Sequence, residues 1–312
     1  MDPGVLLCER PALLPRPPGA LHQETMTIPA DLDFRWTGPP DGLEFVVEGV
    51  WYARGMSQHG RERILPSAGA VLLIVLGPPL QMVSAADPKT VLRVEGAWIE
   101  GAHERPTLNE PPGETHAVGV VFTPGGVSQI MDGPATSITN EILPIDATTL
   151  RLRPGRVLVE RVRTVVDPDE AMAELGTAVA EVTSGVPDTA WLRGIRRLAA
   201  GETESVAEVQ ESLGVSRRYF VEQVRERAGL TPKFLQRIAR MRRLLDQIDA
   251  RRPVRWSQEA VGAGYFDQAH AIRDFRAFTG LTPTEYVERR RRAWGDDVEQ
   301  GEAANFVPEV IR

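Results

Sequence analysis

The chain has 312 residues, of which 42% are hydrophobic and 25% are charged, and its formal net charge is −7. The composition is ordinary for a soluble globular protein, and the length suggests two domains. A membrane-spanning helix is not expected, because the longest apolar run, residues 68–80, contains Gly77, Pro78 and Pro79 and falls short of about 18 residues. The single cysteine, Cys8, excludes an internal disulfide and a Cys-x-x-Cys metal site. The N-terminus lacks the pattern of a secretion signal, so a cytoplasmic protein is predicted.

Residues 1–28 are predicted to be a mobile tail. Prolines occur at positions 3, 11, 15, 17 and 18, and the segment has no hydrophobic periodicity. The sequence leaves open whether translation starts at Met1 or at Met26. We therefore expect the first folded domain to begin at about residue 29.

Residues 29–150 are predicted to form a β-rich domain. Short β-branched and aromatic runs alternate here with Gly and Pro clusters, as is typical of a compact sandwich or barrel. The runs are LEFVVEGVWYARG, VLLIVLG, TVLRVEGAWIEG and ETHAVGVVFTPGG. The GPPL sequence at 77–80 is interpreted as a turn, and VSQIMDG at 127–133 is expected to form a short helix.

Two groups of side chains in this domain are weighed as binding sites. Three aromatic residues are expected in the core, with a ligand pocket as the alternative: Trp51, Tyr52 and Trp98. Three histidines lack the spacing of a metal site and are expected at the surface: His59, His103 and His116. The chain also lacks a nucleophile-elbow or phosphate-loop pattern. We therefore expect no metal, no cofactor and no enzymatic activity.

From about residue 151 the hydrophobic periodicity becomes helical. Asp167 and Pro168 indicate a helix start, because Asp is a favoured N-cap and Pro fits the first helical turn. We assign residues 151–185 to a helical linker and interpret 184–187 as a hinge. Asp188 is expected to cap the helix that follows.

The C-terminal third contains the same helical unit twice, at an offset of 51 residues. The sequence GLTP at 229–232 recurs at 280–283, and Arg225 corresponds to Arg276. In each unit a short helix, 206–213 or 256–261, leads into a turn that contains glycine. Such a sequence of short helix, turn and longer helix predicts a helix-turn-helix.

Side chains at the ends of the longer helices support this prediction. Ser216 and Asp267 are favoured N-caps, since their side-chain oxygens can accept from free backbone N–H groups. Gly229 and Gly280 suit the left-handed conformation that ends a helix. In the second unit Thr282, Pro283 and Glu285 form the pattern of a capping box at the next helix.

Helical geometry divides each longer helix into two faces. The core face is predicted to carry Phe220 and Val224 in the first unit, and Ala271, Phe275 and Phe278 in the second. The opposite face carries Arg218, Glu222 and Arg225 in the first unit, and Gln268, Ala269, Arg273 and Arg276 in the second. Arg can bond to guanine, Gln to adenine and Glu to cytosine in a major groove, so these faces have the chemistry of DNA recognition.

A long helix is predicted to join the two units. Six apolar residues recur on it at helical spacing: Phe234, Leu235, Ile238, Met241, Leu245 and Ile248. Its length of about 25 Å is compatible with two recognition helices one DNA turn apart. Four arginines on it are candidate phosphate contacts: Arg237, Arg240, Arg242 and Arg243. Residues 214–292 carry a net charge of +9, which leaves −16 for the rest of the chain and favours a polyanionic partner of this segment.

Residues 206–292, about a quarter of the chain, resemble the DNA-binding domain of AraC-type transcription regulators (AraC/XylS family), which has two helix-turn-helix units. The sequence GYFDQAHAIRDFRAFTGLTPTEY resembles the family signature. The resemblance implies that residues 216–228 and 267–279 are the two reading helices. Arg227 departs from the pattern, because its counterpart in the second unit is the aromatic Phe278.

The N-terminal half is similar to a β-rich domain that precedes such DNA-binding modules. The similar sequences are RILPSAGAVLLIVLG, WIEGAHERP and GVVFTPGG. The resemblance implies that this domain senses a ligand, mediates dimerisation, or does both.

The sequence therefore predicts an α+β multidomain protein with an N-terminal β-barrel or sandwich and an all-α C-terminal domain of two helix-turn-helix units joined by a long helix. The DNA-binding domain is assigned to 186–293 and a tail to 294–312. The expected DNA-binding residues are Ser216, Arg217, Arg218, Glu222, Arg225, Arg237, Arg240, Gln268, His270, Arg273 and Arg276. For His270, a capping or packing role is the alternative to a phosphate contact.

Candidate partners are double-stranded DNA, a small-molecule effector, RNA polymerase and a second copy of the chain; no membrane partner is expected. Two other functions remain open. One is a β-barrel enzyme with an accessory DNA-binding module, which would require a convergent metal or acid–base cluster. The other is a regulator that works through protein contacts without a small ligand.

Overall fold

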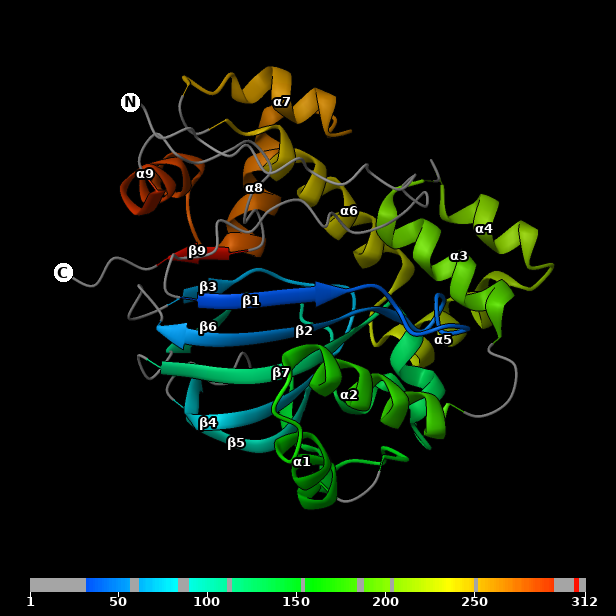
Figure 1. Ribbon diagram of the computed structural model, residues 1–312. Coiled ribbons are helices and arrows are strands. Elements are labelled where there is room, and N and C mark those ends of the chain that lie inside the picture. Colours follow the sequence, from blue (N-terminus) through cyan, green and yellow to red (C-terminus); the bar gives the residue numbers. More distant parts are fainter. Residues whose placement is uncertain are drawn as a thin grey trace, which may run out of the picture.

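The computed structural model describes residues 32–56, 62–83, 90–110, 114–152, 155–183, 188–202, 205–249, 252–294 and 306–308. A curved β-sheet is followed along the chain by a helical C-terminal domain, of which α3 to α5 (residues 189–228) lie past one end of the sheet and α6 to α9 (residues 232–294) lie along its upper side in Figure 1. This architecture confirms the predicted α+β fold with a β-rich first part and an all-α domain that carries both helix-turn-helix units. The tail 1–28, the hinge 184–187 and His59 lie outside the described residues.

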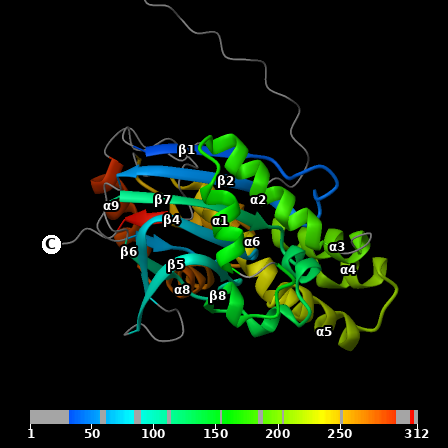
Figure 2. The same ribbon diagram turned by 60° about the horizontal axis from the view of Figure 1, so that its bottom comes forward.

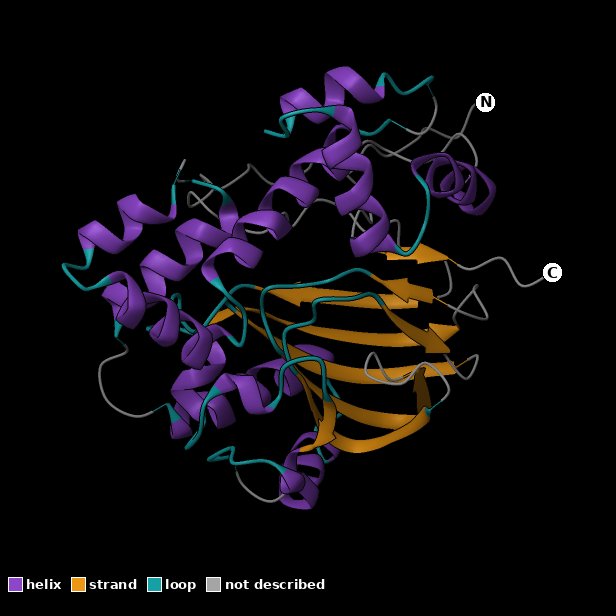
Figure 3. Cartoon of the chain, turned by 180° about the vertical axis from the view of Figure 1, so that it is seen from behind, coloured by secondary structure: helices purple, strands orange, loops and turns teal. Residues whose placement is uncertain are grey.

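The described strands form one antiparallel sheet (Figure 3). They are β1 (Leu32–Thr37), β2 (Val47–Met56), β3 (Glu62–Ile64), β4 (Val71–Val83), β5 (Val91–Glu100), β6 (Thr107–Glu110), β7 (Glu114–Phe122), β8 (Ile142–Pro144) and β9 (Phe306–Pro308). The strand order is β1-β2-β7-β4-β6-β3-β9, and β5 pairs with both β4 and β8. β4 pairs with β5 along one edge and with β7 and β6 along the other, and buried side chains of β2, β4, β5 and β7 share one apolar core.

The GPPL sequence lies within β4 and not at a turn between strands. The register of β4 against β5 shifts between Val75 and Leu80, where Pro78 and Pro79 lack the N–H needed for a regular ladder. Before this irregularity β4 pairs with β7, and from Gln81 onward it pairs with β6. The two prolines therefore mark the position at which β4 changes its partner.

Two helices cover the sheet, as Figure 2 shows: α1 (Gly155–Arg163) and α2 (Pro168–Val182). The carboxylate of Asp167 accepts from the backbone N–H groups of Asp169 and Glu170, which confirms the predicted start of α2. Leu158 and Leu175 are buried in the same hydrophobic core as the strands. The segment 151–185, which the sequence suggests is a linker, thus belongs to the packed core of the N-terminal domain.

Short 3₁₀-helices complete this domain: η1 (Gly126–Ile130), η2 (Ala135–Ser137) and η3 (Ile145–Ala147). The first of them lies at the short helix predicted after the glycine pair at 125–126. The left-handed conformation of Gly125, with φ 86°, allows the chain to turn from β7 into η1.

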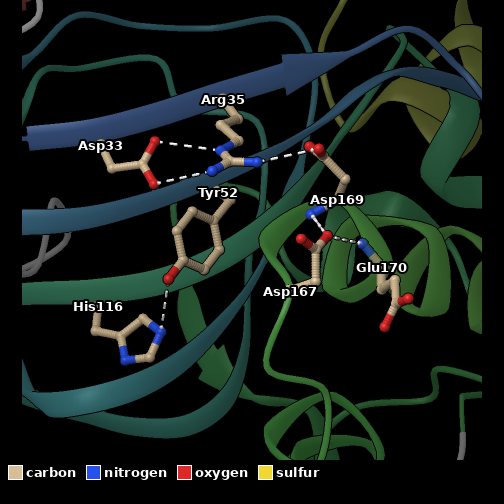
Figure 4. A network of polar contacts seen from close by, with 7 residues as sticks. All are labelled: Asp33, Arg35, Tyr52, His116, Asp167, Asp169 and Glu170. Carbon is tan, nitrogen blue, oxygen red and sulfur yellow. Dashed lines mark hydrogen bonds and ion pairs between the residues drawn. The ribbon is translucent and has the colours of Figure 1, made fainter.

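An exposed ionic network joins the sheet to α2 (Figure 4). The guanidinium of Arg35 on β1 lies 3.2 Å from an oxygen of Asp33 and 3.0 Å from an oxygen of Asp169. These contacts orient the first turn of α2, but solvent screening keeps the contribution of such exposed pairs to stability small.

A polar contact across β2 and β7 makes the stability of the sheet dependent on pH. The Tyr52 hydroxyl lies 3.1 Å from Nε2 of His116 (Figure 4). Partial burial, together with the positive charge of Arg54, lowers the pKa of His116. The unfolded chain therefore binds the proton more tightly than the folded chain. The resulting contribution to stability is complete above the ordinary histidine pKa of about 6.5 and is lost as the pH falls toward the folded-state pKa.

Replacing His116 with glutamine is expected to reduce this pH dependence, because glutamine can still bond to Tyr52 but does not titrate. The melting temperatures of the wild-type protein and His116→Gln should be measured from pH 7 to pH 5. We expect the wild-type protein to lose more stability than the variant over this interval. Parallel profiles would contradict the proposed role of His116.

The prediction of a surface position is wrong for His103. Its side chain is buried, and Nε2 lies 3.0 Å from a carboxylate oxygen of Glu100, which is itself partly buried. Tyr52 is buried, whereas Trp51 and Trp98 are only partly buried. Within the described ranges, no group of three or more His, Cys, Asp or Glu side chains is placed to hold a metal ion. None of the helices described combines the length and apolar character needed to cross a membrane.

The segment predicted as a C-terminal tail returns to the sheet. Strand β9 pairs antiparallel with β3, with Val307 opposite Arg63. This pairing supplies hydrogen-bond partners to one edge of β3, which would otherwise present free backbone groups.

The helices of the C-terminal domain are α3 (Thr189–Ala200), α4 (Val206–Ser212), α5 (Arg217–Ala228), α6 (Pro232–Gln247), α7 (Trp256–Gly262), α8 (Gln268–Thr279) and α9 (Pro283–Trp294). Their buried apolar side chains form a second core, which also includes Leu65, Ala68 and Ala102 of the sheet domain. The two domains therefore share an apolar contact.

Candidate nucleic-acid interface

The first helix-turn-helix consists of α4 and α5. The turn between them contains Gly214, whose φ of 65° is readily adopted by glycine. Ser216 then caps α5, because its hydroxyl oxygen accepts from the backbone N–H of Tyr219 at 3.3 Å. Gly229 ends the helix with φ 76°. These features confirm the predicted cap and terminator of the first reading helix.

The second unit, α7 and α8, has the same construction. Its turn contains Gly264 with φ 87°. A carboxylate oxygen of Asp267 accepts from the backbone N–H of His270 at 2.7 Å, and Gly280 ends α8 with φ 68°. The duplicated sequence therefore gives duplicated geometry.

The predicted capping box at the start of α9 is also present. The backbone N–H of Thr282 donates to Glu285 Oε2 at 2.7 Å, and the N–H of Glu285 donates to the Thr282 hydroxyl at 3.2 Å. These hydrogen bonds lower the pKa of Glu285. Because the bonds form immediately after the turn that ends α8, they also fix how the chain leaves the second reading helix.

Helix α6 holds the two units at a fixed separation. It has 16 residues, which corresponds to a length of about 24 Å. The hydroxyl of Thr231 caps it by accepting from the N–H of Phe234. Five of the six apolar residues predicted for its inner face are buried, and Phe234 is partly buried. A helix anchored in this way along its length can act as a rigid spacer.

The outer faces of α5 and α8 are exposed, as the helical periodicity predicts. The exposed residues on α5 include Arg217, Arg218, Glu222 and Arg225. Those on α8 include Gln268, Ala269, Arg273 and Arg276. The opposite faces are buried, including Phe220 and Val224 on α5 and Phe275 and Phe278 on α8. Each helix thus presents hydrogen-bonding side chains to the outside while the domain core fixes its position.

Arg237 has a different environment from these exposed arginines. Its Nη2 lies 2.8 Å, and its Nε 3.2 Å, from Oδ1 of Asp274 on α8. The guanidinium also lies over the rings of Phe234 and Phe278, at 5.1 and 5.2 Å from their centroids. Arg237 therefore connects α6 to the second reading helix, and a phosphate contact would have to compete with this pair.

The other arginines of α6 also make contacts within the protein. Arg240 lies over the ring of Tyr265 at 5.7 Å, and Arg243 donates to the carbonyl of Gly201 at 3.1 Å. Burial lowers the pKa of Arg242. Arginine side chains of α6 that the sequence suggests as phosphate contacts thus also contact other parts of the protein.

His270 packs against its neighbours within the protein, which is the predicted alternative to a phosphate contact. Its ring packs edge-on against Tyr265 at 5.2 Å, and Nε2 lies 3.9 Å from an oxygen of Asp274. The side chain remains 39% exposed, so its outer edge still faces solvent.

Arg227 compensates for the missing aromatic residue of the first unit. Its guanidinium lies 4.9 Å from the ring centroid of Trp191 on α3 and pairs with Asp188 at 3.5 Å. The ring of Trp191 in turn stacks on Phe220 at 5.8 Å. The prediction that the Asp188 side chain caps α3 is wrong, because its carboxylate pairs with Arg227 and makes no hydrogen bond to the helix start. This support for α5 could not be predicted from the repeat, because Trp191 lies outside it on α3.

The sheet domain touches both reading helices at their C-terminal glycines. The hydroxyl of Thr139, just after η2, lies 3.1 Å from the carbonyl of Gly229 at the end of α5. The guanidinium of Arg63 lies beside Gly280 at the end of α8. A groove of about 510 Å³ adjoins the second contact and lies between residues 104–106 and the side chains of Phe234 and Phe278. The sheet domain therefore contacts the C-terminal ends of both α5 and α8.

Comparison with known families identifies the helical part. A family described as a helix-turn-helix domain matches residues 194–289. The chain carries a helix-turn-helix domain of the AraC type. This match confirms the resemblance given by the GLTP repeat for the helical domain. A family described as a domain of unknown function (DUF6597) matches residues 37–144, which contain most of the sheet.

Among solved structures, the chain is similar to ToxT from Vibrio cholerae. The ToxT structure from strain O395 has 12% sequence identity and a TM-score of 0.41, and the match covers 82% of this chain and 97% of that chain. A 1.65 Å ToxT structure gives 11% identity, a TM-score of 0.42, and coverage of 83% and 98%. Wild-type ToxT bound to an unsaturated fatty acid gives 8% identity, a TM-score of 0.39, and coverage of 84% and 97%. Likeness at this level does not transfer a function. No curated protein is significantly similar to the chain.

Proposed function

We propose that the protein is a cytoplasmic, sequence-specific transcription regulator that inserts α5 and α8 into successive major grooves of double-stranded DNA. The expected base-reading residues are Arg217, Arg218, Glu222, Arg225, Gln268, Arg273 and Arg276, while Ser216 and His270 lie at the starts of the two helices. Arg237 and Arg240 stay predicted phosphate contacts, which would have to compete with the pairing of Arg237 to Asp274 and with the packing of Arg240 on Tyr265.

One observation carries this proposal. Two helices of the same construction present arginine-rich faces outward, and a single helix of about 24 Å joins them. Adding the widths of the two reading helices brings their separation close to one DNA turn of about 34 Å. The expected phosphate and base contacts require both this spacing and the exposed side chains.

Selection from a random-sequence duplex pool tests the proposal. The full-length protein should enrich a defined sequence, and the affinity for that sequence should fall steeply as the salt concentration rises, because phosphate contacts release counterions. The selected duplex should bind more tightly than a scrambled duplex of the same composition. Failure to retain duplex DNA at low ionic strength, or equal affinity for the two duplexes, would contradict sequence-specific binding.

We further propose that an effector acts on the N-terminal domain and changes DNA affinity. The contacts from Thr139 to Gly229 and from Arg63 to Gly280 support this, because both join the sheet domain to the end of a reading helix. A metabolite library should yield a ligand that raises the melting temperature, since a ligand of the folded state stabilises it. The same ligand should alter the affinity for the selected duplex. A ligand that raises the melting temperature without altering DNA affinity would contradict this coupling.

The remaining partners stay predictions. RNA polymerase and a second copy of the chain are expected at surfaces other than the outer faces of α5 and α8. The helix-turn-helix match favours a regulator over an enzyme that carries an accessory DNA-binding module.

A further inference from the structure

Phe266 lies on the protein surface in the turn of the second helix-turn-helix. Its side chain is 92% exposed, whereas the neighbouring Tyr265 is buried. The residue immediately precedes Asp267, the N-cap of α8. A large apolar side chain in this position leaves almost its entire surface in water, so its contribution to the fold is small.

The usual structural role of an apolar residue here is absent. An apolar residue before an N-cap often packs against the fourth residue of the helix, which for α8 is Ala271. The equivalent residue of the first unit, Val215, is partly buried and packs against the same core as Phe220. Phe266 occupies the same position in the repeat as Val215, but its side chain is exposed to solvent. The difference between the two units points to a role outside the fold.

The surroundings of Phe266 belong to the face assigned to DNA. Gln268 and Ala269 follow it and are exposed, and Arg273 is exposed one turn further along α8. The N-terminal residues of a recognition helix approach base edges in the major groove. A phenylalanine cannot donate or accept a hydrogen bond there, and the thymine methyl group is the apolar feature of that groove.

We propose that Phe266 is a specificity-determining residue that contacts a thymine methyl group at the part of the binding site read by α8. This inference rests on the proposed DNA-binding function. It adds one apolar contact to a face whose other expected contacts are polar, and it predicts that the second unit prefers thymine at one position. The first unit lacks this preference, because Val215 is turned toward the core.

Uracil substitution tests the proposal, because uracil differs from thymine only by the missing methyl group. Each thymine of the selected duplex is replaced singly by uracil, and the affinities of the full-length wild-type protein and Phe266→Ala are compared. Loss of one buried methyl group predicts that the wild-type protein binds about fourfold more weakly at one position in the α8 half-site. Phe266→Ala should bind the thymine and uracil duplexes at that position equally, whereas Phe266→Leu should retain a preference for thymine.

Val261→Ala provides the matched control, since Val261 is an apolar residue of α7 in the same unit and is 65% exposed. This variant should keep the wild-type response to uracil. The inference is overturned if the wild-type protein selects a sequence but uracil lowers the affinity of wild-type protein and Phe266→Ala equally, or of neither, at every position. A protein partner for Phe266 is then favoured. If the wild-type protein selects no sequence at all, the DNA-binding proposal itself fails.

Discussion

Replacing Asp274 with alanine is expected to lower the free energy of unfolding by about 1.5–3 kcal/mol, because it removes charge-assisted hydrogen bonds and leaves the partly buried charge of Arg237 without its partner. The side chains of Asp274 and Arg237 are 8% and 29% exposed, and the pair joins α6 to α8. Denaturant unfolding of the full-length protein measures this change. We also expect DNA affinity to fall, since the pair helps to orient the second reading helix.

Glu288→Ala is the matched control for this experiment. Glu288 lies 3.9 Å from Arg292 on α9, and both side chains are more than half exposed. Its removal should cost less than about 1 kcal/mol, as for other surface ion pairs. Arg237→Ala should destabilise the protein much as Asp274→Ala does. If Arg237→Ala instead weakens DNA binding and leaves the unfolding free energy unchanged, Arg237 is a phosphate contact and not a structural one.

Replacing Arg273 with alanine is expected to weaken binding to the selected duplex by about 1–3 kcal/mol, which is the usual range for a bidentate contact to guanine. Arg273 is exposed on the outer face of α8, and burial of Ala271 and Phe275 on the opposite face fixes its direction. The affinity for a scrambled duplex should fall less, because only the base contact depends on sequence.

Arg93→Ala controls for the loss of one positive charge. Arg93 lies on β5 with its side chain 72% exposed, and it belongs to the sheet domain. This variant should keep the ratio of affinities for the selected and scrambled duplexes. If Arg273→Ala weakens both duplexes equally, Arg273 acts as a phosphate anchor and does not read a base.

Local patterns predicted the reading helices well. Ser216, Asp267 and Thr282 each form the predicted cap, because capping depends on a few neighbouring atoms and is visible in a short stretch of sequence. Gly229 and Gly280 end their helices in the left-handed conformation for the same local reason. The buried face of each helix follows from its helical period.

Long-range contacts could not be predicted in this way. The net charge of +9 counts Arg242 and Arg290 as available positive charges, yet Arg242 is partly buried and Arg290 is buried beside the ring of Tyr286. The pairing of Arg237 with Asp274 joins residues 37 positions apart. A helical pattern likewise shows that α1 and α2 each have an apolar face, but it does not show that this face packs against the sheet.

Methylation protection of the selected duplex by the full-length protein tests the central proposal most directly, because dimethyl sulphate reacts with guanine N7 in the major groove. Two reading helices at the ends of α6 predict two clusters of protected guanines on one face of the duplex, with centres about 10 base pairs apart. Arg273→Ala should weaken protection in one cluster more than in the other. A single protected cluster, or protection confined to the minor groove, would contradict insertion of α5 and α8 into successive major grooves.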